Sequence, residues 1–191
     1  MNIELVIPYW IEERLLDYES DFSSIEARME FVVALAEENV TKGTGGPFAA
    51  VIFDMDSWRP VAAGVNLVTS HNCSVFHAEI VAIISAQKKM GCFDLSEALH
   101  GKFELVTSTE PCAMCFGAIP WSGVISLVCG ARDVDARAIG FDEGPKLPDW
   151  EKALEERGIQ VTLDIAREKA AAVLKSYAAS GGVIYNGRGR V

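Results

Sequence analysis

The sequence predicts an α/β fold in which helices cover both faces of a single sheet. Short apolar runs of strand character alternate along the chain with longer segments of helical period. This alternation favours parallel strand pairs joined by helices. The run at 124–131 is almost continuously apolar, as in strands buried on both faces. The 191 residues contain no linker, repeat or low-complexity tract, so we expect one domain over 1–191.

The first motif-bearing part of the chain predicts a helix followed by a hairpin. The helix is expected over 23–43, because Ser23 and Glu26 have the spacing of a capping box and the apolar residues that follow form one stripe. Two apolar runs separated by a turn then predict paired strands at 48–54 and 61–69.

The rest of the chain predicts helices and strands in alternation. Strands are expected at 102–108, 124–131 and 159–165. A helix that begins at Pro111 should end before Pro120, because proline interrupts a helix interior. The remaining helices are predicted at 77–91, 149–158 and 167–180, with a polar loop at 132–148.

The two ends of the chain lie outside this pattern. Residues 1–22 form an N-terminal extension that mixes aromatic and acidic residues, and we expect a short amphipathic helix packed across the domain. Residues 183–191 form a C-terminal tail, which by default is a frayed terminus.

The charge and cysteine content narrow the classes of function. Lys and Arg number 17 against 27 Asp and Glu, and the resulting net charge of −10 repels a phosphate backbone, so nucleic acid is not expected as a partner. No segment has the length of a membrane span, and the N-terminus lacks the features of a signal peptide, so we expect a cytoplasmic protein without a membrane partner. Five cysteines are an odd number and do not suggest a disulfide framework.

Two short motifs at predicted helix starts contain the candidate metal-binding and catalytic residues. "PCAMC" places Cys112 and Cys115 on one side of a first helical turn, where free backbone N–H groups and the helix dipole favour thiolates. "HAE" places His77 at another helix start. Two thiolates and one imidazole leave the fourth position of a tetrahedral zinc ion open, which is typical of a catalytic site. Glu79 would then lie beside the metal as a proton carrier.

Other interpretations of these motifs explain fewer residues. A redox Cys-x-x-Cys pair leaves His77 and Glu79 without a role. A structural zinc site needs a fourth ligand, and the other cysteines are isolated in the sequence. A zinc-stabilised binding module without turnover fits the ligands but not Glu79. The catalytic interpretation is therefore favoured.

"HAE" at 77–79 together with "PCAMC" at 111–115 resembles the signature of the zinc-dependent cytidine deaminase superfamily. The resemblance extends over about 25–165 and includes "GGPFAAVI" and Asn66. It implies a three-layer α/β/α fold with a five-stranded mixed sheet. It also implies hydrolytic deamination with one zinc ion per chain, bound by His77, Cys112 and Cys115.

Two later segments resemble one particular group within this superfamily. "AIPWSG" followed by "AIGFDEG" is similar to bacterial guanine deaminases, which implies guanine as the substrate and Trp121, Asp142 and Glu143 as the discriminating residues. Members that act on free cytidine usually have cysteine as the first ligand, and transfer-RNA adenosine deaminases generally carry basic surface. Cytosine, cytidine, adenosine, an aminotriazine or tRNA adenosine remain as alternative substrates.

The resemblance also implies catalytic roles. Zinc would lower the pKa of its water. Glu79 would carry a proton from that water to N3 of guanine while hydroxide attacks C2, and the collapse would release ammonia and xanthine. Asp142 and Glu143 follow a Gly-Phe pair, and Glu143 would protonate the departing amine. From composition alone, this segment is a solvated acidic loop.

Substrate binding is implied for four further residues. Asn66 resembles the family asparagine that hydrogen-bonds the base, although it could be an ordinary turn residue. Phe48 and Trp121 would stack on the ring or wall it, although aromatic residues are more often core. The tail can exchange between subunits in guanine deaminases, which implies a homodimer and a role for Tyr185 in closing the pocket.

Overall fold

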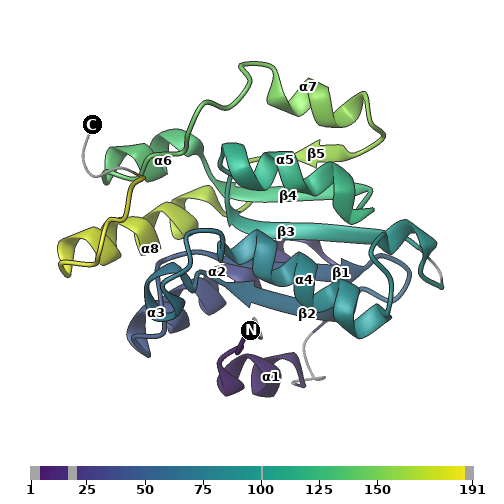
Figure 1. Ribbon diagram of the computed structural model, residues 1–191, viewed down its shortest axis with the longest axis horizontal. Coiled ribbons are helices and arrows are strands. Elements are labelled where there is room, and N and C mark those ends of the chain that lie inside the picture. The colour runs from purple at the N-terminus through teal and green to yellow at the C-terminus, as the bar shows by residue number, and fades with distance from the viewer. Residues whose placement is uncertain (1–4, 17–20, 100, 188–191) are drawn as a thin grey trace.

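Within residues 5–16, 21–99 and 101–187, which the computed structural model describes, five strands form one mixed sheet (Figure 1). The strand order is β2-β1-β3-β4-β5. β1 pairs antiparallel with both β2 and β3, whereas β3, β4 and β5 are parallel. This confirms the predicted mixed sheet. The strands are β1 Ala49–Asp54, β2 Pro60–Val65, β3 Phe103–Thr109, β4 Ser126–Ala131 and β5 Gln160–Thr162.

Helices cover both faces of the sheet, so the three-layer prediction is confirmed. α2 (Ile25–Thr41) packs on β1 and β3, and α8 (Arg167–Ala179) packs on β4 from the same side. α4 (Ala78–Met90) packs on β2 and β1 from the other side, where it contacts α5 (Ala113–Ser122). Each face buries its own apolar cluster, because β3 and β4 are buried along their whole length.

The N-terminal extension contains the expected short helix. α1 (Tyr9–Leu15) packs against the edge strand β2 and buries Trp10 and Ile11. Residues 1–4 and 17–20 of the extension lie outside the described residues. No helix among the described residues is both long enough and apolar enough to cross a bilayer.

The start of α2 differs by one residue from its prediction. Ser24, not Ser23, is the N-cap, and its side chain accepts a hydrogen bond from the Ala27 N–H at 3.2 Å. The Ser23 N–H instead donates to the Asp21 carboxylate at 2.9 Å. A serine pair offers two possible caps, and the preceding turn at Asp21 selects the second.

The hairpin is confirmed, but its second strand is shorter than predicted. β2 ends at Val65, and the chain then forms the single turn α3 (Val68–His71). The Asn66 N–H donates to the Phe48 carbonyl at 2.9 Å, and the Leu67 N–H donates to the Phe76 carbonyl. The chain thus leaves the sheet directly after Asn66, which places that residue at the end of the ladder.

The structure corrects two further predictions, the end of one helix and the absence of a helix from a loop. α5 continues through Pro120 to Ser122, where the Ser122 hydroxyl donates to the Ile119 carbonyl at 2.7 Å and a left-handed Gly123 follows. Proline near the C-terminal end of a helix removes only one intrahelical donor. The expected polar loop at 132–148 contains α6 (Asp133–Ala138), because the Asp135 carboxylate accepts the Arg132 N–H at 2.8 Å. α7 (Trp150–Glu155) follows as predicted.

Candidate active site

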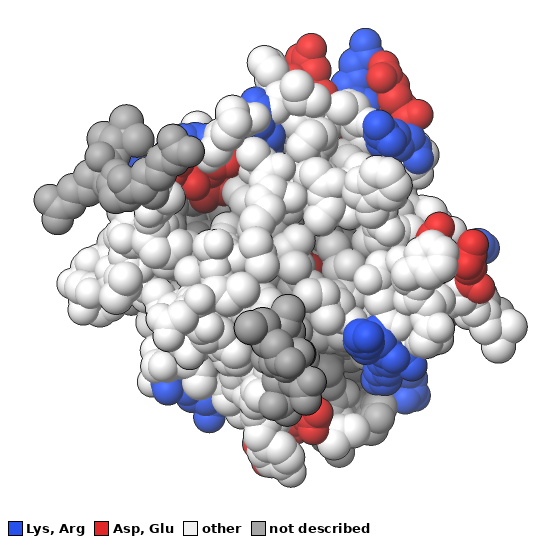
Figure 2. Space-filling model, viewed as in Figure 1, with Lys and Arg blue, Asp and Glu red and all other residues white. Residues whose placement is uncertain are grey.

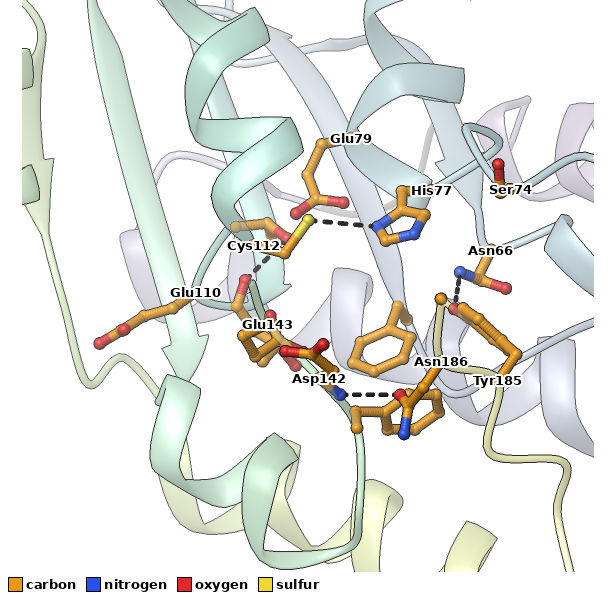
Figure 3. A pocket seen from close by; sticks show the side chains of 15 residues that line it. Asn66, Ser74, His77, Glu79, Glu110, Cys112, Asp142, Glu143, Tyr185 and Asn186 are labelled. Atoms are coloured by element: carbon orange, nitrogen blue, oxygen red, sulfur yellow. Dashed lines mark hydrogen bonds between the residues drawn. The ribbon is translucent and has the colours of Figure 1, made fainter. Parts of the chain in front are cut away.

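Two helix N-termini on the same face of the sheet bring the predicted metal ligands together. His77 is the N-cap of α4, and Cys112 is the N-cap of α5. The ligand atoms of His77, Cys112 and Cys115 lie within 4.8 Å of one another, and the Cys112 Sγ lies 3.4 Å from the His77 Nδ1 (Figure 3). One nitrogen and two sulfur donors fit a catalytic zinc ion, which takes three protein ligands and keeps one position open.

The two thiols differ in their readiness to ionise. A hydrogen bond from Cys115, together with the bond to His77, lowers the pKa of Cys112 to about 4 despite its burial. The pKa of Cys115 is raised by its hydrogen bond to Cys112 and by burial. Burial lowers the pKa of His77, but the hydrogen bond and negative charge of Cys112 outweigh it and the pKa is raised. Cys112 is thus a thiolate at neutral pH, the form that binds a metal ion.

Glu79 lies in the first turn of α4, buried beside the ligand cluster. In Figure 3, its carboxylate points toward Cys112 and His77. Burial raises the pKa of Glu79 to about 7, and the negative charge of Cys112 adds to the rise. A carboxyl group that titrates near neutrality both accepts and donates protons readily, which a general acid–base catalyst requires.

A cavity of about 130 Å³ opens next to the ligand cluster. It is lined by residues from distant parts of the chain, so the fold assembles it. All but one of the expected catalytic and substrate-binding residues line this cavity, namely Phe48, Asn66, Glu79, Asp142, Glu143 and Tyr185.

The two acidic residues of "AIGFDEG" have different surroundings. Glu143 is buried, and burial raises the pKa of its carboxyl group to about 8, with a further rise from the charge of Cys112. The Glu143 carbonyl accepts the Ala113 N–H at 2.9 Å, which ties the loop to the first turn of α5. The Asp142 side chain is half exposed, and it accepts the Gly144 N–H at 2.9 Å. Asp142 therefore stabilises the turn that presents Glu143.

The C-terminal tail of the same chain closes one side of the cavity. The Asn66 amide donates to the Tyr185 hydroxyl, and the Tyr185 ring lies 5.2 Å from the Phe141 ring, measured between centroids. Asn186 accepts the Asp142 N–H at 2.9 Å and donates to the Gly140 carbonyl at 3.0 Å. The tail is therefore bound to its own pocket up to Asn186. Residues 188–191 lie outside the described part of the chain.

Trp121 is the exception, and its expected contact with the base stays a prediction that this cavity does not support. Its side chain is 81% exposed, and it does not line the cavity. α5 continues through Pro120, so Trp121 lies nine residues beyond Cys112, which at a rise of about 1.5 Å per residue is on the order of 13 Å along the helix.

Sequence reasoning missed several residues that line the cavity. Thr107 and Thr109 alternate along the end of β3, just before the cysteine motif, and this period of two could have identified them. Phe141 belongs to the same "AIGFDEG" segment as the predicted acids. Asn186 follows Tyr185, but nothing local to the tail predicts its bonds to the loop at 140–142.

Comparison with known proteins places this geometry in a family. The family model for the cytidine and deoxycytidylate deaminase zinc-binding region matches residues 23–131. The chain is similar to the guanine deaminase of Bacillus subtilis, with 40% identity over 141 residues, 72% of this chain and 86% of that protein. It is also similar to the solved structure of NE0047 in complex with 2,6-diaminopurine, with 47% identity, 97% of each chain covered and a TM-score of 0.89.

A third similarity extends over nearly the whole chain. The structure of a guanine deaminase from Nitrosomonas europaea has 45% identity, covers 94% of this chain and 98% of its own, and has a TM-score of 0.88. These similarities agree with the paired helix starts, the zinc-type donor set and the buried Glu79 described above. The chain therefore belongs to the cytidine and deoxycytidylate deaminase family and is a zinc-dependent hydrolytic deaminase.

Proposed function

We propose that this deaminase converts free guanine and water to xanthine and ammonia. The observation that carries the proposal is the pair of buried carboxyl groups, Glu79 and Glu143, that face one cavity beside the predicted zinc ligands. Removal of the 2-amino group needs proton transfers at a ring nitrogen and at the departing amine, and two carboxyl groups suit two such transfers. Two proteins to which the chain is similar, from Bacillus subtilis and Nitrosomonas europaea, are guanine deaminases, and this similarity supports the same substrate.

In this proposal, one zinc ion per chain is bound by His77, Cys112 and Cys115. When bound there, zinc acts as a Lewis acid that lowers the pKa of a water molecule toward neutrality. Glu79 would take a proton from the attacking water as the water oxygen bonds to C2, and would deliver that proton to N3. Glu143 donates a proton to the 2-amino group, and the C2–N bond breaks. The new C2 hydroxyl would return a proton to the Glu143 carboxylate, so both carboxyl groups regain their starting forms and one water is consumed for each ammonia released.

The remaining cavity residues would orient the base. Asn66 offers an amide that can both donate and accept a hydrogen bond. The Phe48 and Phe141 rings lie 5.0 Å apart between centroids and provide an apolar wall. The Tyr185 hydroxyl accepts a hydrogen bond from the Asn66 amide. We therefore propose that the tail closes the pocket and orients Asn66 toward the base.

Nucleic acid remains an unfavourable substrate for electrostatic reasons. The chain carries a net charge of −10. Figure 2 looks onto α4 and α5, and the Lys and Arg side chains on this face lie mainly toward its rim, interspersed with acidic ones. A phosphate backbone needs clustered cations along its path. A free base carries no phosphate and is not repelled in this way.

We also propose a homodimer in which α5 contacts a second copy. Met114, Gly117 and Trp121 are spaced three and four residues apart, and all three are exposed on one side of α5. A large exposed tryptophan beside a glycine is typical of a surface that packs against a partner. The tail already contacts its own pocket through Asn66 and Asp142, so this dimer needs no exchange of tails. We place the enzyme in the cytoplasm, where the two metal-binding thiols stay reduced.

Trp121→Glu tests the dimer. A charge in the centre of an apolar interface should convert the dimer to a monomer in analytical ultracentrifugation at micromolar concentration. Val134→Glu is the matched control, because Val134 is an exposed apolar residue on a different helix, α6. A wild-type chain that sediments as a monomer contradicts the dimer, and equal effects of the two substitutions contradict the α5 surface.

Ammonia release from a panel of aminated rings tests the substrate. Guanine should be the best substrate by kcat/KM, ahead of cytosine, cytidine, adenosine and aminotriazines, with xanthine identified as the product. A faster reaction with any other member of the panel rules out the guanine assignment but leaves the deaminase assignment intact.

A further inference from the structure

Asn39 is a buried polar residue outside the cavity that uses all of its amide groups. It lies near the C-terminal end of α2 and is 0% exposed. Its Nδ2 donates to the Gly46 carbonyl at 2.8 Å and to the Asn66 carbonyl at 3.0 Å. Its Oδ1 accepts the Thr44 hydroxyl at 2.6 Å, which fixes the orientation of the amide. A side chain buried in this way is stable only while these bonds are kept.

The two carbonyls that Asn39 binds belong to the segments that carry Phe48 and Asn66. The β1–β2 ladder ends at the Ala49–Val65 pair, followed by one bond from the Asn66 N–H to the Phe48 carbonyl. Beyond this point the Gly46 and Asn66 carbonyl groups are hydrogen-bond acceptors, and the Asn39 side-chain amide donates to both of them. Asn39 therefore fixes the separation of the two segments at the edge of the cavity.

The loop before Phe48 is pressed closely against Asn66. A Cβ added to Gly45 would lie 1.8 Å from the Asn66 carbonyl oxygen and 2.9 Å from the Asn39 Nδ2. A Cβ added to Gly46 would lie 3.1 Å from the Asn66 Oδ1. Gly45 is thus required by close approach to the Asn66 backbone, whereas a side chain at Gly46 would press on the Asn66 side chain. The 1.8 Å contact explains the glycine at position 45 in "TGGPF".

We propose that Asn39 is a positioning residue that sets the distance between Phe48 and Asn66 and so the fit of the base between them. This role rests on the proposed recognition of guanine by Asn66. Asn39 does not itself line the cavity, and it acts through the backbones of Gly46 and Asn66. A displacement of Asn66 should weaken productive binding of the base more than the chemical step, because the zinc ligands and Glu79 lie on other segments.

Asn39→Leu tests the role, because leucine has a similar size and cannot donate to either carbonyl. We expect zinc content to stay at the wild-type level and kcat/KM for guanine to fall about 10- to 100-fold, mainly through a higher KM, as misplaced binding groups typically cause. In a crystal structure of the variant, the Asn66 side chain should be displaced. Thr44→Val, which removes only the hydroxyl that orients the amide, should raise KM a few-fold.

Ser126→Ala is the matched control for lost stability. The Ser126 hydroxyl makes a buried hydrogen bond of 2.9 Å to Glu104 at the opposite end of the sheet. This variant should lower the melting temperature without changing KM. An equal rise in KM in Ser126→Ala and Asn39→Leu would show a general effect of destabilisation and overturn the proposal.

Three results separate this proposal from the proposed function. Wild-type protein that releases no ammonia from guanine contradicts the proposed function, and the crystal structure of Asn39→Leu still tests the positioning role. If Asn66→Ala impairs guanine turnover but Asn39→Leu does not, Asn39 has no positioning role. Should Asn39→Leu fail to fold, an unchanged KM in folded Thr44→Val overturns the proposal.

Discussion

The metal-ligand cluster and the base-binding side of the cavity are built in different ways. His77, Glu79, Cys112 and Cys115 lie at the starts of two regular helices on one sheet. Asn66, Glu143 and Tyr185 lie on a strand end, a loop and the tail, which are held mainly by bonds between distant residues. The predicted metal ligands and Glu79 are thus placed by regular secondary structure, and the residues proposed to contact the base by irregular segments. Substitutions should therefore abolish turnover in the first region and, with the exception of Glu143, mainly alter its efficiency or selectivity in the second.

The largest effect is expected for Cys112→Ala. This substitution removes the thiolate with the pKa of about 4, and two remaining ligands bind zinc poorly. Zinc content measured on purified protein should fall well below one ion per chain, and ammonia release should be lost. Cys92→Ala is the control, because Cys92 is a free cysteine outside the cavity. Normal zinc content in Cys112→Ala would refute the ligand assignment.

Glu79→Gln should separate metal binding from proton transfer within the first region. Glutamine keeps the shape of the side chain but cannot carry a proton. We expect full zinc content and a fall in kcat of at least about 10²–10⁴-fold. Steady-state kinetics with metal analysis on the same preparation measure both quantities. A kcat near the wild-type value would exclude Glu79 from the mechanism.

Glu143→Gln and Asp142→Asn test whether the second region contributes to chemistry as well as to recognition. Glu143 is buried in the cavity, whereas Asp142 is half exposed and bonded to its own turn. We expect Glu143→Gln to retain zinc and lose most guanine turnover, and Asp142→Asn to be milder. The reverse order would exchange the two roles. Normal kcat in both variants would remove the loop from catalysis and weaken the guanine assignment.

A smaller effect than for the catalytic carboxyl groups is expected for Asn66→Ala. Loss of one hydrogen bond to a buried polar group costs roughly 1–3 kcal/mol, so kcat/KM should fall by about one or two decades. Zinc content should stay normal, because Asn66 belongs to the recognition side. The variant also loses the bond to Tyr185. Asn66→Asp is the informative partner variant, since it keeps an acceptor and loses the donor. An unchanged kcat/KM in Asn66→Ala would make Asn66 a turn residue only.

The same contrast explains what the sequence could predict. The ligands and Glu79 follow from local spacing at two helix starts, and the alternation of elements predicts the sheet and its layers. The boundaries at Ser24 and Pro120 could not be predicted, because each depends on a hydrogen bond made by a neighbouring turn or cap. Asn39 and Asn186 act on residues far away in the chain, and no local pattern reports such bonds.

Glu143 is joined to the zinc-binding helix by a bond between main-chain atoms, from the Ala113 N–H to the Glu143 carbonyl. This bond does not depend on which side chain occupies position 143. The loop can therefore keep its place against α5 while the group presented to the cavity is exchanged. A change at this one codon would therefore replace the group presented to the cavity while the loop, the zinc ligands and Glu79 keep their places. Saturation mutagenesis at position 143 would accordingly measure which side chains support turnover on an unchanged backbone.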